Sequence, residues 1–322
     1  MDKYNQITEE ERYQIWANRK AGFSIPEIAA ELGRSKSTIY REIERNTGAR
    51  GYRPKQANLK AQKRKSTSKK AVKMTAELID VIEEKLCLDW SPEQISGWMF
   101  TENRMLISHE RIYQHIWKDK RQGGTLFKHL RCQGKKYDKR RNGKSTRGHI
   151  KNPVSIDERP HIVNDKKRVG DWEIDTVIGK NHLGAIVTIV ERKTLFTVAA
   201  LVDRKKADVV TKATVQLLTP LKGCVHTITA DNGKEFAYHE KLVDKLETQV
   251  YFAHPYSSWE RGLNENTNGL LRQYFPKGTD FRTLSQCDID MAVERINNRP
   301  RKTLGFKTAA EMMKKSLSQM AA

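Results

Sequence analysis

Three carboxylates in the C-terminal half of the chain have residue types and surroundings that fit metal-dependent chemistry. Asp175 lies in a short apolar stretch that reads as a buried strand, Asp231 follows a second such run, and Glu265 lies in a predicted helix. Carboxylates buried near one another raise each other's pKa, so such a cluster needs cations to stay ionised. Hard oxygen ligands suit Mg²⁺ or Mn²⁺. Because two such ions about 4 Å apart clamp a phosphorus centre for in-line displacement, the sequence predicts phosphoryl transfer.

These acids are far apart in sequence, so only a fold can bring them together. The pattern of apolar residues predicts a three-stranded meander, after which helices alternate with two more strands. The predicted strands are 172–176, 184–190, 195–201, 226–229 and 248–253, and the predicted helices are 207–218, 234–246, the helix that carries Glu265, 282–297 and 309–316. This order gives a mixed sheet with helices on both sides.

The first strand carries three acids on one face. Asp171, Glu173 and Asp175 share that face because side chains alternate along a strand. Periodicity therefore leaves open whether Asp171 or Glu173 supports a site at Asp175 or simply points away from the sheet edge.

The predicted helix around Glu265 also presents a polar face. Glu265, Asn268 and Arg272 lie on that face by their i, i+3, i+7 spacing. The loop 254–262, which precedes the helix, is rich in aromatic residues. It reads equally well as a mobile flap over the site or as a rigid, packed connection.

The stretches around the three acids resemble the catalytic core of DDE transposases and retroviral integrases, which adopt the ribonuclease H fold. The stretch 172–176 is similar to the first strand of these cores and selects Asp175 from its neighbours. Between Asp231 and Glu265 lie 33 residues, and Arg272 follows Glu265 by seven positions, where the superfamily usually has Lys or Arg.

Two further stretches narrow the resemblance. The segment 295–308 is similar to the end of integrase-type cores. The run 256–277, taken with the N-terminal features described below, most resembles bacterial transposases of the insertion sequence 30 family.

This resemblance implies a mechanism and a set of partners. It implies that Asp175 bridges two Mg²⁺ or Mn²⁺ ions, that Asp231 and Glu265 hold one each, and that Arg272 reaches a DNA phosphate. Cleavage at the 3′ end of an element would be followed by attack of the freed 3′-hydroxyl on target DNA. The implied partners are double-stranded DNA, both the terminal inverted repeats and the target, and further copies of the chain in a homodimer or larger assembly.

The composition of the chain agrees with a nucleic-acid partner. Its 322 residues carry a formal charge of +21, with a pI near 9.8. Such an excess of positive charge favours a polyanionic binding partner, and nucleic acid is the usual one. No apolar run has the length of a membrane span, and the N-terminus lacks a secretory signal. The four cysteines are widely spaced, as in a reduced protein of the bacterial cytoplasm.

The first 49 residues predict a helix-turn-helix domain. Helices are expected at 8–21, 24–33 and 35–45, with Gly33 in the turn between the last two. One face of the third helix presents side chains that suit base edges or phosphates, namely Lys36, Ser37, Thr38, Tyr40 and Arg41. The alternative is a generic three-helix module with a solvated, charged face.

The rest of the chain divides by composition. We predict a multidomain protein with a basic linker at 50–75, a second helix-turn-helix-like domain at 76–120, a basic arm at 121–158 and a ribonuclease H-like core at 159–322. The second domain offers Arg111, Tyr113 and Gln114 for DNA contact. The linker holds ten Lys or Arg and no acid, so it is expected to order on DNA, in part as a helix.

Three functions fit these features. The first is a metal-dependent transposase. The second is a non-catalytic, sequence-specific repressor, which would have no use for the three acids. The third is a ribonuclease H-type nuclease acting on RNA–DNA hybrids, which would not need two duplex-reading domains.

Overall fold

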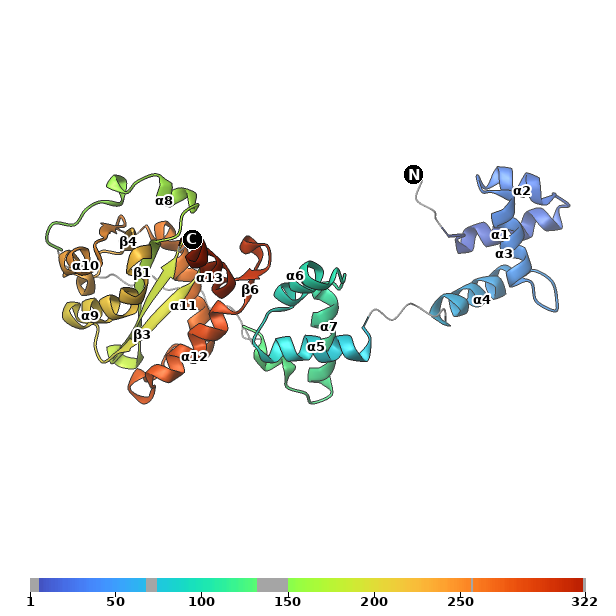
Figure 1. The fold of residues 1–322 in the computed structure, drawn as a ribbon. Coiled ribbons are helices and arrows are strands. Elements are labelled where there is room, and N and C mark those ends of the chain that lie inside the picture. The colour runs from blue at the N-terminus through green and yellow to red at the C-terminus, as the bar shows by residue number, and fades with distance from the viewer. Residues whose placement is uncertain (1–5, 68–73, 132–149, 256, 321–322) are drawn as a thin grey trace. The chain divides into compact units, whose positions relative to one another are not determined.

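The computed structural model describes residues 6–67, 74–131, 150–255 and 257–320. The chain forms two compact units, Met1–Lys73 and Met74–Ala322 (Figure 1). Of the basic arm predicted at 121–158, residues 132–149 lie outside the described part of the chain, and the rest includes two 3₁₀ turns, Leu126–His129 and Ile156–Glu158. None of the helices in the described ranges is both long enough and apolar enough to cross a bilayer.

The described residues of the first unit, 6–67, form four helices. They are α1 (Glu9–Lys20), α2 (Ile25–Glu31), α3 (Lys36–Asn46) and α4 (Pro54–Thr67). The turn between α2 and α3 contains Gly33 with φ +58°, a backbone conformation that glycine adopts at little cost. Ile28 and Ala29 of α2 and Ile39 of α3 are buried together, so these two helices form the predicted helix-turn-helix.

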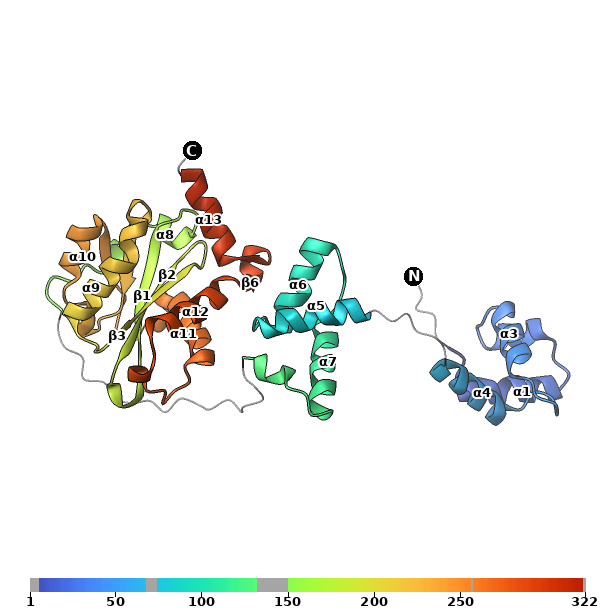
Figure 2. The ribbon, with the colours of Figure 1, turned by 60° about the horizontal axis from the view of Figure 1, so that its bottom comes forward.

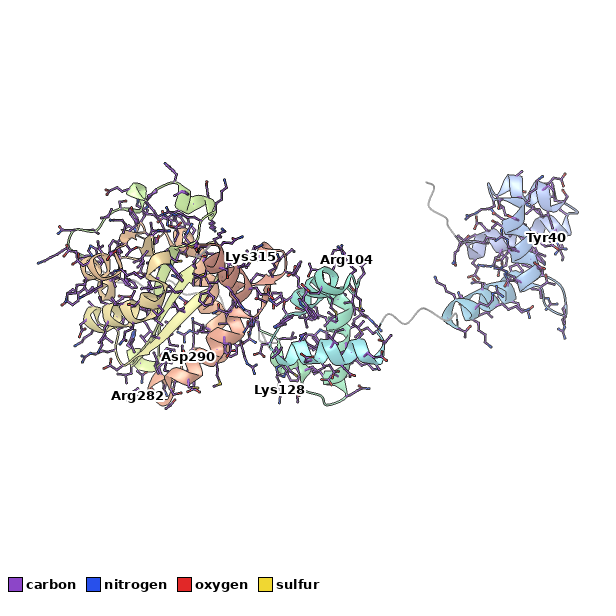
Figure 3. The ribbon with its side chains drawn as sticks, in the orientation of Figure 1. Tyr40, Arg104, Lys128, Arg282, Asp290 and Lys315 are labelled. Atoms are coloured by element: carbon purple, nitrogen blue, oxygen red, sulfur yellow. The ribbon has the colours of Figure 1, made fainter. Side chains whose placement is uncertain are left out.

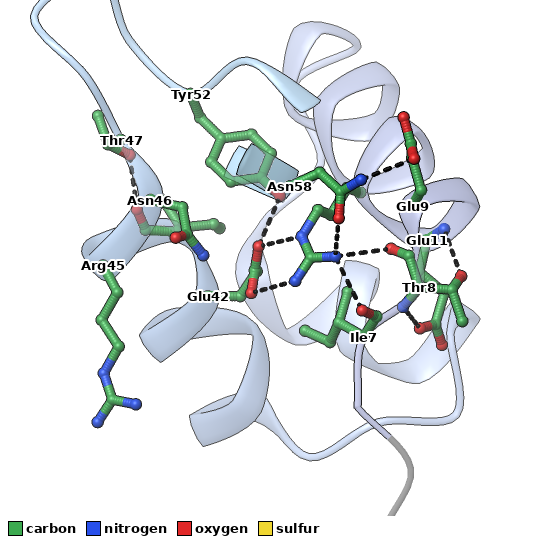
Figure 4. Close-up of polar contacts among 12 residues, drawn as sticks. Ile7, Thr8, Glu9, Glu11, Glu42, Arg45, Asn46, Thr47, Tyr52 and Asn58 are labelled. Atoms are coloured by element: carbon green, nitrogen blue, oxygen red, sulfur yellow. Dashed lines mark hydrogen bonds and ion pairs between the residues drawn. The ribbon is translucent and has the colours of Figure 1, made fainter. Parts of the chain in front are cut away.

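A buried arginine connects the helices of this unit (Figure 4). Arg12 of α1 is 6% exposed and holds both carboxylate oxygens of Glu42 on α3, with its Nε 2.7 Å from Oε1. Its Nη1 donates to the carbonyl of Ile7 and to Asn58 on α4. The hydroxyl of Tyr52 also donates to Glu42. One guanidinium therefore links α1, α3 and α4.

Helix α4 occupies much of the segment that the sequence analysis assigns to a basic linker. Its residues Pro54 and Ala57 are buried, and Ala57 packs with the apolar core of the helix-turn-helix. Two of its basic residues, Lys60 and Arg64, donate to the carbonyls of Thr47 and Arg45 at the end of α3. A run of charges therefore does not exclude a helix that packs through a narrow apolar strip.

The second unit begins with a helical part of three α-helices, α5 (Ala76–Cys87), α6 (Pro92–Asn103) and α7 (His109–Arg121), followed by the 3₁₀ turn η1 (Leu126–His129). Ile82, Leu86, Ile95, Ile112 and Ile116 are fully buried among them. Ser91 and Ser108 cap α6 and α7 with their hydroxyls.

The larger part of this unit is built on a five-stranded sheet. The strands are β1 (Asp171–Ile178), β2 (Ala185–Glu191), β3 (Thr197–Val202), β4 (Thr227–Ala230) and β5 (Gln249–Phe252). Their order in space is β3-β2-β1-β4-β5, with β1, β2 and β3 antiparallel and β1, β4 and β5 parallel. A three-stranded meander extended by two parallel strands confirms the expected ribonuclease H-like fold.

Helices cover both faces of this sheet (Figures 1 and 2). The helices α9 (Ala207–Leu218) and α10 (His239–Leu246) pack with apolar residues of one face, and α11 (Gly262–Tyr274) and α12 (Gln286–Asn297) with those of the other. The shorter elements are α8 (Ile162–Asp165), β6 (Pro300–Arg301) and β7 (Lys307–Thr308), and the chain ends in α13 (Ala309–Met320).

Asp89 joins the helical part of the second unit to the sheet part. It follows α5 and accepts hydrogen bonds from Tyr274 at the end of α11 and from Arg295 of α12, at 3.0 and 2.8 Å. Its other oxygen lies 3.1 Å from Nδ1 of His129. Burial raises the pKa of Asp89, but hydrogen bonds from His129, Arg295 and Tyr274 outweigh it, and the pKa lies below its ordinary value.

The buried pair in the first unit gives a testable prediction. Replacing Arg12 with Met leaves the Glu42 carboxylate buried and uncompensated, so we expect the first unit to lose about 3–5 kcal/mol of stability. Hydrogen exchange of the full chain, followed by mass spectrometry, would show faster exchange in peptides of α1, α3 and α4, with the sheet unchanged. Glu44→Gln, at an exposed position of α3, serves as the control. Equal protection in Arg12→Met and wild type would contradict the prediction.

Candidate active site

The parallel pairing of β1 with β4 brings two of the predicted acids together. Glu173 of β1 lies opposite Thr229 of β4. Two residues further along the chain come Asp175, still in β1, and Asp231, directly after the end of β4. Both therefore project from the same face of the sheet. Adjacent strands lie about 4.8 Å apart, so the two carboxylates are neighbours.

The turn after β4 fixes the direction of Asp231. Its Oδ1 accepts the backbone N–H of Gly233 at 2.9 Å, which closes the turn that the sequence predicts after this strand. The side chain of Asn232 donates to the carbonyl of Ala253 and ties the same turn to the end of β5. The other carboxylate oxygen of Asp231, Oδ2, is not used in this turn.

Arg261 lies against both aspartates. Its Nη1 is 3.7 Å from Oδ1 of Asp175, and its Nη2 is 3.4 Å from Oδ2 of Asp231. Burial raises the pKa of Asp175 above its ordinary value, the Arg261 guanidinium opposes this rise, and neighbouring Asp231 adds to it. By its sequence pattern Arg261 belongs only to a loop. Its position four residues before Glu265 is the one signal that would have drawn attention to it.

Asn268 of α11 holds the side chain of Asp175 in one orientation. Its Nδ2 donates to Oδ2 of Asp175 at 2.9 Å, and its Oδ1 accepts the hydroxyl of Thr188 on β2 at the same distance. Thr188 lies opposite Asp175 in the β1–β2 pairing. The amide is therefore fixed at both ends, and it holds one oxygen of Asp175 while the other faces Arg261.

Glu265 lies in the first turn of α11, three residues before Asn268. Residues at this spacing are neighbours on a helix surface, so Glu265 stands beside the residue that contacts Asp175. Its side chain is exposed. In the described part of the chain, no three His, Cys, Asp or Glu side chains lie close enough together to hold one metal ion.

The oxygen donors of this site fit a divalent cation. Asp175 and Asp231 already share one positive group, the guanidinium of Arg261. Both aspartates keep access to solvent, with 24% and 39% of their side chains exposed. Two carboxylates that accept a shared cation at a solvent-accessible edge have the ligand type that Mg²⁺ and Mn²⁺ prefer.

The other two acids of β1 are engaged in buried pairs. Asp171 accepts two hydrogen bonds from Arg168 and one from Thr227. Glu173 pairs with Arg192, and it also accepts the backbone N–H of Asn264 in the first turn of α11. A carboxylate at a helix N-terminus stabilises that end of the helix. Glu173 therefore supports the helix that carries Glu265, and Asp171 faces its own arginine.

Arg272 does not extend into open solvent in this structure. It is half-buried, and it donates to the carbonyl of Ile178 at 2.9 Å and to the carbonyl of Phe275 at 3.3 Å. Its guanidinium carbon also lies 5.8 Å from the ring centre of Phe281. The side chain thus connects α11 to the end of β1, and its contact with a DNA phosphate stays a prediction.

The residues predicted to meet DNA on α3 are largely exposed. Lys36, Ser37, Tyr40 and Arg41 all face solvent, and Thr38 is partly covered because it contacts the capping residue Ser35. Tyr40 is 57% exposed and projects from the surface of the first unit (Figure 3). On α7, Arg111 and Gln114 are exposed and contact each other, whereas Tyr113 packs partly against the helical core.

The chain has clear relatives among known proteins. A helix-turn-helix domain model matches residues 3–46. The chain is 48% identical to the transposase for insertion sequence element IS4351 of Bacteroides fragilis, over 97% of each chain. It is 36% identical to the transposase InsI for IS30A of Escherichia coli K12, over 97% of this chain and 84% of the relative. Among solved structures, the catalytic core domain of BIV integrase aligns with 48% of this chain and 99% of its own, at 20% identity and a TM-score of 0.39.

The chain joins a helix-turn-helix domain to a ribonuclease H-like sheet. The identity to insertion-element transposases extends over nearly the whole chain. The chain belongs to the IS30 family of transposases.

The contact of Asn268 with Asp175 gives the prediction from this site. Asn268→Ala removes the donor that holds Asp175, and loss of a partner that orients a metal ligand costs about 10–100-fold in metal affinity or activity. We expect a reduction of this size in DNA cleavage, with DNA binding unchanged. Gln216→Ala, at an exposed amide of α9 on the opposite face of the sheet, should cleave at the wild-type rate. Wild-type cleavage by Asn268→Ala would show that Asp175 needs no such support.

Proposed function

We propose that this transposase binds the terminal inverted repeats of its element and performs metal-dependent strand cleavage and strand transfer at Asp175, Asp231 and Glu265. The observation that carries the proposal is the meeting of Asp175 and Asp231 on neighbouring strands around one shared cation. A protein that only binds DNA has no need to keep two carboxylates side by side at a solvent-accessible edge, because their repulsion opposes folding.

Each residue of the site has a distinct part in this proposal. Asp175, Asp231 and Glu265 would hold the metal ions, and Asp175, which Asn268 of α11 contacts and which neighbours Asp231, would be the central ligand. Asn268 fixes the orientation of Asp175. When bound, Mg²⁺ or Mn²⁺ would generate the attacking nucleophile from water or the 3′-hydroxyl and stabilise the leaving oxygen. No side chain forms a covalent bond to DNA, because cleavage and strand transfer both use an oxygen nucleophile from outside the protein.

The DNA is held by the basic surfaces. The charge of +21 gives the chain a strong, salt-dependent attraction to phosphate. The exposed residues of α3 supply contacts that can read a sequence, and α7 offers Arg111 and Gln114 for the same purpose. Joining two ends to one target requires two copies of the site, so a homodimer or a larger assembly is the proposed working form. The site of action is the bacterial cytoplasm, where the element and its target DNA lie.

The proposal predicts the outcome of three single substitutions. Asp175→Asn, Asp231→Asn and Glu265→Gln each remove one metal-binding charge while keeping the shape of the side chain, so each should abolish cleavage and joining. The measurement uses an end-labelled duplex containing the element's end, incubated with the full chain and Mg²⁺ or Mn²⁺, beside an EDTA control. Band shifts on the same duplex should be unchanged.

The matched control is Asp244→Asn, at an exposed acid of α10 on the opposite face of the sheet, which should cleave normally. Joining by any of the three site variants would remove that residue from the proposed site. Specific binding by the wild type without metal-dependent cleavage, even with paired ends, would favour a repressor.

The residues of α3 give a separate prediction about binding. Lys36→Ala and Arg41→Ala should weaken binding to the terminal repeat, and each lost phosphate contact should lower the salt slope of binding by about 1. If a substitution lowers the ratio of the affinity for the repeat to the affinity for a random duplex, the replaced side chain contacts a base. Fluorescence anisotropy at several salt concentrations measures both effects. Lys245→Ala, exposed on α10, controls for general loss of charge. Equal effects of all three variants would argue against α3 as the DNA-facing helix.

A further inference from the structure

A buried guanidinium occupies the place between the two aspartates. Arg261 is 9% exposed, and its two terminal nitrogens lie 3.7 Å from Asp175 and 3.4 Å from Asp231. Arginine keeps its charge at every pH that a folded protein experiences, so this cation is permanent. The metal ions of the proposed reaction need oxygens of the same two carboxylates.

The backbone holds Arg261 in place from one side only. Its Nη1 donates to the carbonyl of Ile174 at 3.1 Å, while its Nε is buried without a hydrogen-bond partner among the described residues. Both contacts with the aspartates are longer than the 2.7–2.9 Å of a good charge-assisted hydrogen bond. The positive charge of the guanidinium therefore compensates the two carboxylates without a short hydrogen bond to either. The hydrogen bond to the carbonyl of Ile174 holds Arg261 more closely than its contacts with the aspartates do.

One other cation of the described structure acts on Asp175, because the charge of Lys205 lowers the pKa of that carboxyl, but the Nζ of Lys205 is held by Glu235 at 2.7 Å. Asn268 and Thr188, which contact or face Asp175, are neutral. Arg192 is engaged by Glu173 on the same face. Among the ion pairs of the described residues, only Arg261 reaches Asp175 or Asp231. Without Arg261, these two carboxylates would face each other across neighbouring strands with no cation between them.

We propose that Arg261 is a built-in counter-ion that keeps the aspartate pair assembled before metal binding, and that divalent ions must displace it from between the carboxylates. The inference rests on the proposed function, because it assumes that the metals bind at Asp175 and Asp231. Arg261 is thus a positioning residue whose fixed charge lowers the affinity of the empty site for metal.

The position of Arg261 in the chain links this exchange to the third carboxylate. It is the last residue of the 3₁₀ turn η6 (Ser258–Arg261), which runs directly into α11 and reaches Glu265 four residues later. A movement of Arg261 away from the aspartates has to be taken up in this segment. The arrival of metal at the aspartates and the placement of Glu265 would therefore be coupled through one short stretch of chain.

The test measures metal binding without DNA and without turnover. Isothermal titration of the full chain with Ca²⁺, and in parallel with Mn²⁺, gives the affinity of the site. Arg261→Gln removes the competing charge and should bind either ion about tenfold more tightly or better, because a divalent ion no longer enters beside a fixed positive charge. Arg261→Lys retains the charge and should stay within about threefold of wild type. Without metal, Arg261→Gln should unfold at a lower temperature than wild type. Saturating Ca²⁺ should raise the unfolding temperature of the variant back to that of wild type.

The control is Arg282→Gln, which removes an exposed arginine from its pair with Asp280 elsewhere in the same unit. Its metal affinity should equal that of wild type. Asp175→Asn is titrated in the same series to locate the metal. If Asp175→Asn loses Ca²⁺ binding while Arg261→Gln binds no more tightly than wild type, the counter-ion role is wrong and the proposed metal site stands. If Asp175→Asn binds as wild type does, or wild type binds no ion, both proposals are overturned.

A second measurement needs no substitution at Arg261, and so it does not depend on how that variant folds. Hydrogen exchange of the wild-type chain should show reduced protection in the segment 257–263 when Ca²⁺ saturates the site, since displacement of Arg261 loosens this stretch. If calorimetry shows that Ca²⁺ saturates the site while hydrogen exchange in 257–263 stays unchanged, the proposal that metal displaces Arg261 is wrong.

Discussion

The parallel pairing of β1 and β4 is the constraint on which the site depends. It places Asp175 and Asp231 on one face of adjacent strands, where two negative charges cannot remain without compensation. The residues around them follow from this constraint. Arg261 supplies a positive charge, and Asn268 donates a hydrogen bond to the carboxylate that is covered more deeply. The helix α11 provides Asn268 and Glu265 because its first turn is held on Glu173, two residues before Asp175.

Much of this arrangement was predictable from the sequence, because it depends on local periodicity. The strand period placed Asp171, Glu173 and Asp175 on one face, and the order of strands and helices predicted the mixed sheet correctly. The register between β1 and β4 was not predictable, because it is set by contacts between segments more than fifty residues apart. Periodicity could not choose among the three acids either. Only the structure shows that Asp171 and Glu173 have arginine partners of their own.

Side chains that turn back onto the backbone were the hardest to predict. Arg272 shares a helical face with Glu265, and the structure adds two backbone carbonyl partners that no local pattern indicates. Helix α4 presents a related difficulty, since its many positive charges obscure the small apolar strip that packs on α1. Arg12 is buried for a reason that no local pattern reveals, because its partner Glu42 comes from another helix. In each of these cases at least one partner lies far away in the sequence.

The acids of β1 show how one strand can carry both structural and reactive carboxylates. Asp171 and Glu173 have only 1% of their side chains exposed, and their arginines hold them through short hydrogen bonds. Breaking such a buried pair is strongly unfavourable, so these two acids are committed to the fold. Asp175 lies further along the same strand, 24% exposed, and its arginine comes from a short turn and stays at 3.7 Å. Water and ions can therefore reach Asp175 while its partner holds it loosely. The gradient from tight to loose pairing along β1 separates the carboxylates that build the sheet from the one that is free to exchange its cation.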